Sequence, residues 1–307
     1  EGLYQMVSGY RKIIEAAENW QGKKIILTID GAAHESEVFL NGEKLGEHHC
    51  GYTAFTIDLS GKLRFGEENV LVVKVDSRED RNIPPFGFVI DYMTYGGIYR
   101  DVYIDIHNSI FLQDVFIRSN LEIGEKVKAE IVSEITLNNY IKDALIRQYI
   151  KKKEETEYRP LGEAALSEVK NEIEFTVEGV RLWDTINPNL YDIKIELLLN
   201  NEIVDDKIIT VGFRKAEFEK DGFYLNNKKV KIRGLNRHQS FPYVGYAMPE
   251  SMQKMDADIL KFELGLNAVR TSHYPQSHYF LERCDEIGLL VFTEIPEDRF
   301  HHIVLKN

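Results

Sequence analysis

The sequence has few cysteines and no long apolar run. Its 307 residues include two cysteines, Cys50 and Cys284, which lie far apart in the chain. A disulfide framework needs several cysteines at close spacing, so disulfides are not expected to hold this fold together. A helix that spans a bilayer needs roughly 20 consecutive apolar residues, and no segment comes near that length. The sequence therefore predicts neither a disulfide-stapled scaffold nor a membrane partner.

Basic residues are also scarce relative to acidic ones. Lys and Arg number 38 against 50 Asp and Glu, which gives a formal net charge of −12. Nucleic acids are bound through basic faces, so they are not expected partners. Features of a secretory leader are absent too. The sequence does not determine the cellular location. It slightly favours the cytoplasm, and a secreted or periplasmic location is compatible with a leader that has been removed. Self-association into a homo-oligomer also stays open.

Residues 1–118 have the pattern of an all-β domain. Asn41-Gly42 separates two β-like segments, and Asn-Gly is the strongest short hairpin sign because both residues must take positive φ. Residues 70–75 are nearly all apolar, as in a buried strand. Residues 98–106 form another β-rich run after Gly96-Gly97. Many short strands separated by Gly and Asn turns predict a β jelly-roll sandwich.

Residues 119–216 form a second β-rich region. Apolar and polar residues alternate over residues 127–135, 173–177 and 191–197. About seven short strands over roughly a hundred residues are typical of an immunoglobulin-like β-sandwich. Trp183 precedes a turn-rich segment, and we expect it to fill either the core of this domain or its junction with a neighbour.

Residues 217–307 change from a two-residue period to a helical one. Two helices are predicted near residues 249–264 and 277–287, and each carries an apolar stripe at helical spacing. The first stripe consists of Met252, Met255, Ile259 and Phe262, and the second of Phe280, Cys284 and Ile287, followed by Gly288 as a C-cap. With strands before, between and after the helices, the order is strand, helix, strand, helix, strand.

That order matches the start of a TIM barrel, which has eight strand–helix units and places its chemistry at the C-terminal ends of the strands. Polar residues stand at those ends here: Arg237, His238, Arg270, His273 and Glu294. Three strands cannot close a barrel. The segment after about residue 230 is therefore expected to lean on the second sandwich, to pair with another copy or to be poorly ordered.

Several motifs, in their order along nearly the whole chain, resemble glycoside hydrolase family 2, the group of β-galactosidases, β-glucuronidases and β-mannosidases. They are Val38-Phe39-Leu40-Asn41-Gly42, Gly96-Gly97-Ile98-Tyr99-Arg100-Asp101-Val102, Asn187-Pro188-Asn189-Leu190-Tyr191, Val211-Gly212-Phe213-Arg214, Arg233-Gly234-Leu235-Asn236-Arg237-His238 and Asn267-Ala268-Val269-Arg270-Thr271-Ser272-His273-Tyr274-Pro275. The resemblance implies a sugar-binding jelly roll, an immunoglobulin-like domain and a catalytic barrel.

The resemblance also implies a retaining hydrolysis of terminal β-sugars, in which two carboxylates about 5–5.5 Å apart act as nucleophile and as general acid/base. In the family both are glutamates on later barrel strands, so this sequence is expected to contain neither and to be inactive alone. Asn236-Arg237-His238 looks more like the galactosidases, which favours a β-galactoside. A β-glucuronidase, a β-mannosidase and a non-catalytic carbohydrate-binding module stay as alternatives.

Four residues match sugar-site residues of the family. Asp91 matches an aspartate that reaches from the sugar-binding domain to the barrel mouth, where a carboxylate can accept several hydroxyl hydrogen bonds. His238 and His273 match histidines of the sugar pocket, and Arg270 matches an arginine that keeps the nucleophile ionised. The alternatives are a solvated aspartate, histidines bonded to the backbone, and an Arg270 that is solvated or paired with Glu294.

Glu294 and the remaining histidines are not expected to catalyse or to bind metal. The resemblance gives an acidic residue at Glu294 no catalytic role, so it is expected to fix its neighbours. His48, His49 and Cys50 are adjacent in sequence, and neighbours on a strand point to opposite faces, which disfavours a shared zinc ion. The magnesium-binding Glu-x-His of larger β-galactosidases is not reproduced at residues 295–300. We therefore expect no metal and no cofactor.

Overall fold

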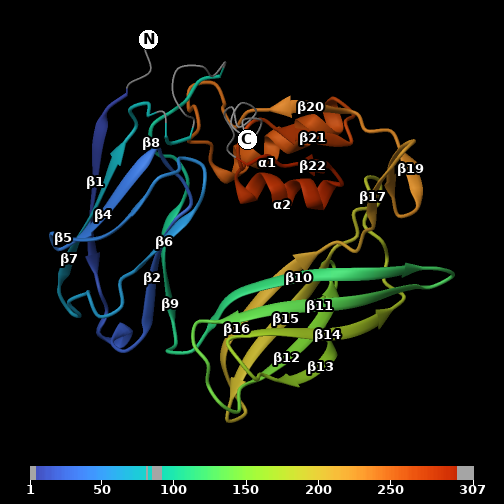
Figure 1. The fold of residues 1–307 in the computed structure, drawn as a ribbon, viewed down its shortest axis with the longest axis horizontal. Coiled ribbons are helices and arrows are strands. Elements are labelled where there is room, and N and C mark those ends of the chain that lie inside the picture. The colour runs from blue at the N-terminus through green and yellow to red at the C-terminus, as the bar shows by residue number, and fades with distance from the viewer. Residues whose placement is uncertain (1–4, 81, 85–91, 296–307) are drawn as a thin grey trace, which may run out of the picture.

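The computed structural model describes residues 5–80, 82–84 and 92–295. Figure 1 shows three parts: a first sandwich on the left, a second at the lower right, and between and above them a mixed part with the two α-helices. This is the architecture that the sequence predicts. Among the described residues, both α-helices are too short and too polar to cross a bilayer.

The first sandwich consists of two main antiparallel sheets, with the strand orders β1-β7-β4-β5 and β6-β2-β9, and a short pair β3-β8. Its core is built from alternate residues such as Ile25, Leu27 and Val73, which are almost fully buried. The elements are β1 (Val7–Glu15), the 3-10 helix η1 (Glu18–Trp20), β2 (Lys24–Ile29), β3 (Ala32–Ala33), β4 (Glu35–Leu40), β5 (Glu43–His48), β6 (Phe55–Asp58), β7 (Glu68–Asp76), β8 (Gly97–Ile98) and β9 (Val102–His107).

The predicted hairpin is confirmed at Asn41-Gly42. Both residues have positive φ, 50° and 88°, and Leu40 pairs with Glu43 across the turn. The predicted run at residues 98–106 is instead divided into β8 and β9, because the chain turns at Tyr99, Arg100 and Asp101. That turn faces the third part of the chain, where Arg100 and Asp101 form hydrogen bonds.

His34, just after β3, predicts a pH dependence of stability. The residue is 4% exposed, and burial lowers the pKa of the imidazole by more than the charges of Glu79 and Asp76 raise it. The unfolded chain therefore takes up a proton that the folded chain does not, starting at about 6.5, the ordinary pKa of histidine. The stability contributed by neutral His34 is complete above that pH and is lost as the pH falls below it.

A falling melting temperature between about pH 7.5 and about pH 5.5 would show this effect. His34→Asn should reduce the fall. His49→Asn is the matched control, because His49 is exposed and burial does not dominate its pKa, which ion pairing raises. An equal fall in the wild type and in His34→Asn would contradict the prediction.

The second sandwich has seven strands in two sheets, β10-β11-β14 and β13-β12-β15-β16. Fully buried apolar residues of both sheets, such as Ile131, Ile146 and Ile195, form its core. β10 pairs with β11 along its length, so the boundary predicted at residue 118 falls inside a strand of this sandwich. The strands are β10 (Leu112–Ile123), β11 (Val127–Leu137), β12 (Leu145–Lys152), β13 (Arg159–Ala165), β14 (Lys170–Glu178), β15 (Tyr191–Leu199) and β16 (Glu202–Val211).

The third part starts with a small antiparallel sheet, β17-β18-β19, followed by the parallel sheet β20-β21-β22 with its two helices. The elements are β17 (Ala216–Glu219), β18 (Gly222–Leu225), β19 (Lys228–Val230), β20 (Gly234–Arg237), α1 (Glu250–Asp258), the π-helical turn η2 (Ile259–Glu263), β21 (Ala268–Thr271), α2 (His278–Ile287) and β22 (Leu290–Phe292). In the described residues the parallel sheet does not close into a barrel.

The two helices agree with the sequence to different degrees. In α2 the predicted stripe is buried, and Gly288 follows with a φ of 75°, as a C-cap requires. In α1 and η2 the predicted stripe does not face the core, since Met255 and Phe262 are 41% and 65% exposed. The buried face there consists of Gln253, Ala257 and Leu260.

The third part leans on both sandwiches. On the second sandwich, Trp183 is 1% exposed, packs with Leu190 and Phe223, and donates a hydrogen bond from Nε1 to the Asp285 carbonyl of α2 at 2.7 Å. On the first, the Tyr279 hydroxyl contacts an Asp101 carboxylate oxygen at 2.7 Å. Trp183 therefore fills the junction between two domains, one of the two places that the sequence suggests.

Candidate functional site

Three neighbouring strand ends bring polar residues together. β20, β21 and β22 are parallel, so their C-terminal ends lie at one edge of the sheet. His238 directly follows β20, His273 lies two residues after β21, and Glu294 lies two residues after β22. The structure thus brings together three of the predicted residues, His238, His273 and Arg270, with Glu294 beside them.

Glu294 holds two of these side chains. Its Oε1 accepts a hydrogen bond from Arg270 Nε at 2.5 Å, and its Oε2 lies 3.1 Å from His273 Nδ1. Arg270 also donates from Nη1 to Asn236 Oδ1 at 3.4 Å. Arg270 is therefore paired with Glu294, which is one of the alternatives that the sequence suggests. Glu294 holds the side chains of Arg270 and His273, as expected. The three side chains of Arg270, His273 and Glu294 stay 43%, 34% and 27% exposed.

The two histidines face each other beside an aromatic residue. The ring centroids of His238 and His273 are 5.4 Å apart, and the ring of Tyr92 lies 4.9 Å from the first and 5.8 Å from the second. Tyr92 comes from the first domain and was not predicted, although it follows Asp91 in the sequence. Asp91 itself lies outside the described residues.

A group of buried tyrosines lies beside the histidines, and the ring centroids of Tyr274 and His238 are 6.0 Å apart. Tyr52 of the first sandwich stacks on Tyr274, with ring centroids 4.3 Å apart and an interplanar angle of 7°, and Tyr246 lies against both. Burial raises the pKa of all three hydroxyls above the ordinary value, so they stay protonated near neutral pH. The result is an uncharged aromatic contact that joins the first domain to the third.

Arg237, which the sequence groups with the strand-end residues, points away from the site. It is 5% exposed, pairs with Asp256 at 2.5 Å, donates to Gln253 at 2.9 Å and lies 3.9 Å from the ring centroid of Phe280. Adjacent residues on a strand face opposite ways, so Asn236 faces Arg270 while Arg237 faces the helices. Arg237 therefore fastens α1 and α2 to the sheet.

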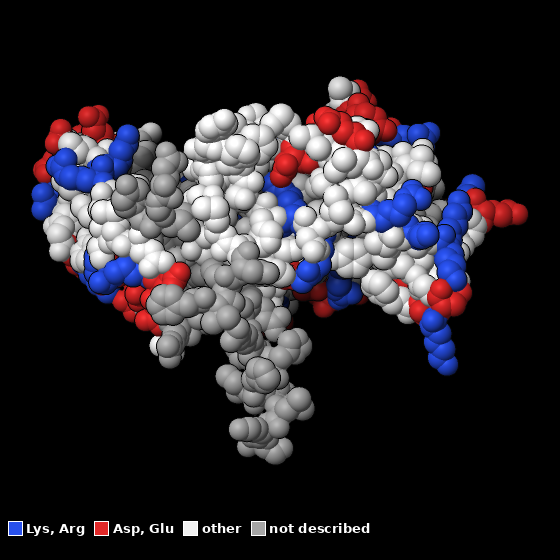
Figure 2. Space-filling model, turned by 90° about the horizontal axis from the view of Figure 1, so that it is seen from above, with Lys and Arg blue, Asp and Glu red and all other residues white. Residues whose placement is uncertain are grey.

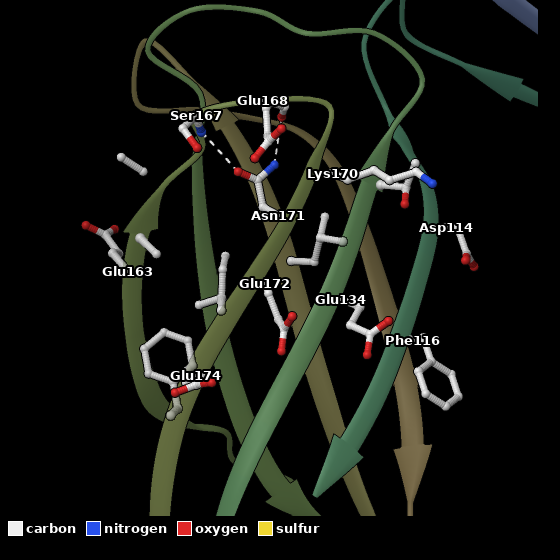
Figure 3. Close-up of a pocket in the computed structure, with 16 residues that line it drawn as sticks. Asp114, Phe116, Glu134, Glu163, Ser167, Glu168, Lys170, Asn171, Glu172 and Glu174 are labelled. Carbon is white, nitrogen blue, oxygen red and sulfur yellow. Dashed lines mark hydrogen bonds between the residues drawn. The ribbon is translucent and has the colours of Figure 1, made fainter.

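A hollow on the second sandwich lies away from the histidine site. It measures about 860 Å³, and residues of the second sandwich line it. Figure 3 shows carboxylates around this hollow, including Glu134 and Glu172, and both of these pair with Arg118. Asn171 is bonded to the Ser167 amide and the Glu168 carbonyl (Figure 3). This hollow is a solvated acidic surface, and its residues are not those of the histidine site.

Charge is distributed without one dominant patch on the face that Figure 2 shows. Acidic and basic side chains are interspersed at both ends of that face, and the surface between them is mostly uncharged.

In the described residues no three potential metal ligands lie close enough together to hold an ion. His48, weighed above as a metal ligand, contacts Thr53 Oγ1 at 2.9 Å, while His49 pairs with Glu35 at 2.7 Å.

Three family models match consecutive segments of the chain. "Glycosyl hydrolases family 2, sugar binding domain" matches residues 4–107, "Glycosyl hydrolases family 2" matches residues 110–214, and "Glycosyl hydrolases family 2, TIM barrel domain" matches residues 216–304. The three matches follow the three parts of the structure in order.

Individual proteins are similar over nearly the whole chain. A beta-galactosidase of Thermoanaerobacterium thermosulfurigenes is 45% identical over 96% of the chain, and one of Thermoanaerobacter pseudethanolicus is 42% identical over 95%. A solved structure of beta-glucuronidase 3 of Bacteroides uniformis is 27% identical over 95% of the chain, with a TM-score of 0.85. The chain spans 42%, 40% and 38% of these three proteins.

Proposed function

Because the chain belongs to glycoside hydrolase family 2, we propose that it is the sugar-binding portion of a retaining β-galactosidase. The observation that carries this proposal is the pair His238 and His273, 5.4 Å apart at the C-terminal edge of the parallel sheet, with Tyr92 of the first domain against both. A site built from two domains at that edge agrees with the place where barrels of this type do their chemistry.

Each side chain of the site has a proposed role. The imidazoles of His238 and His273 can donate and accept hydrogen bonds with sugar hydroxyls. Arg270 provides positive charge that would keep a nearby nucleophilic carboxylate ionised. Asp91 is proposed as a further acceptor for hydroxyls, on its match to the family alone.

A β-galactoside is the substrate that we propose. Two relatives at 45% and 42% identity are beta-galactosidases, whereas a relative named as a putative beta-glucuronidase is 34% identical. A glucuronide carboxylate needs a cation to bind it, and the Arg270 guanidinium is already paired with Glu294. A β-glucuronide is the alternative substrate. Calorimetric titrations of the chain with galactose and with glucuronic acid distinguish the two.

We also propose that the 307-residue chain binds the sugar without cleaving it. A retaining mechanism needs two carboxylates about 5–5.5 Å apart. Among the described residues the carboxylate in contact with the site is Glu294, which is engaged by Arg270 and His273. Purified chain is expected to release no chromophore from a nitrophenyl β-galactoside, and release that persists through repeated purification would contradict this.

Binding is tested by calorimetric titration with galactose. His238→Ala and His273→Ala should each weaken binding about five- to tenfold, which is the effect of losing one or two hydrogen bonds. His49→Ala is the control, since His49 is an exposed histidine of the first sandwich that pairs with Glu35 and Glu47. Galactose binding that is unchanged in both site variants would instead indicate an independent sugar site and would refute the proposed one.

A further inference from the structure

Arg100 links the first sandwich to both segments that carry the histidines. It lies in the turn between β8 and β9, and its Nη2 donates to the Pro275 carbonyl at 2.7 Å and to Gln239 Oε1 at 3.0 Å. Pro275 is two residues after His273, and Gln239 directly follows His238. One guanidinium from another domain therefore contacts the backbone of one histidine segment and the side chain of the other.

Further hydrogen bonds surround this link. Its Nη1 donates to the Tyr52 carbonyl at 3.2 Å, and the ring of Tyr52 stacks on Tyr274. Gln239 is 1% exposed, and its Oε1 also accepts a hydrogen bond from the Ser277 amide at 2.8 Å, at the start of α2. The backbone N–H of Gln239 in turn donates to the Tyr274 hydroxyl at 3.0 Å. These bonds join the β20 end, the β21 loop and α2 to Arg100.

The backbone beneath Arg100 leaves room for its aliphatic stem. A Cβ atom at Gly31 would lie 3.0 Å from Arg100 Cδ and 3.0 Å from Tyr99 Cζ, which is tighter than ordinary contact. The planar guanidinium can donate from Nη2 to Gln239 and Pro275 and from Nη1 to the Tyr52 carbonyl at the same time. A lysine ammonium cannot reproduce this geometry. The site around Arg100 is thus shaped for this side chain.

We propose that Arg100 is a positioning residue for the sugar site: from across the domain junction it sets the separation and orientation of His238 and His273. The expected effect on sugar binding rests on the proposed function. The expected effect of Arg100 on the positions of the two histidines does not depend on it. Small displacements of binding groups can cost large factors in affinity or rate. The loss of Arg100 is therefore expected to act on both histidines, although it contacts neither ring.

The experiment compares the imidazole NMR signals of the 307-residue chain in the wild type and in Arg100→Met, which keeps much of the stem without the donors. The His238 and His273 signals, assigned from their alanine variants, should both shift, and galactose affinity should fall about tenfold. The signal of His107 in the first sandwich should stay in place. Arg78→Met is the matched control, because Arg78 is a 65% exposed arginine of the same domain that pairs with Asp76.

Unchanged signals of both histidines in Arg100→Met would overturn the inference. If Arg100→Met does not fold, Gly31→Ala provides the test, since its methyl group pushes on the Arg100 stem while every donor is kept; unchanged His238 and His273 signals in that variant would again overturn the inference. If the wild type does not bind galactose, the proposed function fails. The histidine signals then still decide the role of Arg100 without any sugar.

Discussion

Trp183→Ala is expected to separate the third part of the chain from the second sandwich, at a cost of about 3–5 kcal/mol. The indole is 1% exposed and packs with Leu190, Phe223 and Leu225. Its Nε1 donates to the Asp285 carbonyl. Alanine leaves a cavity among these residues and an unbonded carbonyl at the junction, so both apolar burial and a buried hydrogen bond are lost.

The measurement is hydrogen exchange followed by peptide mass spectrometry, because a chain of several domains does not unfold in a single step. Peptides from α2 and from β18 should exchange faster in Trp183→Ala, while peptides from β2 in the first sandwich keep the wild-type rate. Trp20→Ala is the matched control: it removes the other tryptophan of the chain, which packs in the first sandwich, so it should affect that sandwich alone. Wild-type protection of α2 in Trp183→Ala would disprove the role of this residue.

Arg237→Met is expected to destabilise the third part by about 3 kcal/mol, because removal of one member of a buried ion pair leaves the other partners unsatisfied. The partners are Asp256, Gln253 and Gln276, and the latter two are 1% and 5% exposed. Asp256 keeps 24% of its side chain exposed, so water can solvate part of the carboxylate. The expected loss of stability is therefore at the lower end of the roughly 3–5 kcal/mol that breaking a buried ion pair costs.

Faster hydrogen exchange in α1 and β20 would show the effect of Arg237→Met. The control is Arg283→Met, which removes an arginine of α2 whose side chain is 29% exposed and which pairs with Asp258 and Glu286. Surface pairs of that kind contribute about 1 kcal/mol or less. Equal effects of the two substitutions would show that Arg237 does not hold the helices through its buried bonds.

Local chemistry explains which elements could be predicted. The Asn41-Gly42 hairpin depends on two residues that tolerate positive φ, and α2 depends on its apolar stripe and on Gly288, so neighbours in sequence are sufficient. The apolar stripe that includes Met255 and Phe262 was a poor guide to the buried face of α1 and η2. Spacing tells which residues share a face of a helix, whereas the packing partner decides which face is covered.

For the candidate site, the parallel order of β20, β21 and β22 follows from the alternation of strands and helices, and it predicts that His238, Arg270 and His273 share one edge. The sequence by itself determined the two sandwiches, the start of a barrel and this set of polar strand ends, because each depends on periodicity and turn residues close in the chain. Only the tertiary structure decided that Arg237 turns toward the helices, that Tyr92 contacts both histidines from another domain, and that Arg100 binds the segments next to those histidines. The contacts of Tyr92 and Arg100 join residues more than a hundred positions apart, and their partners are set by how whole domains pack.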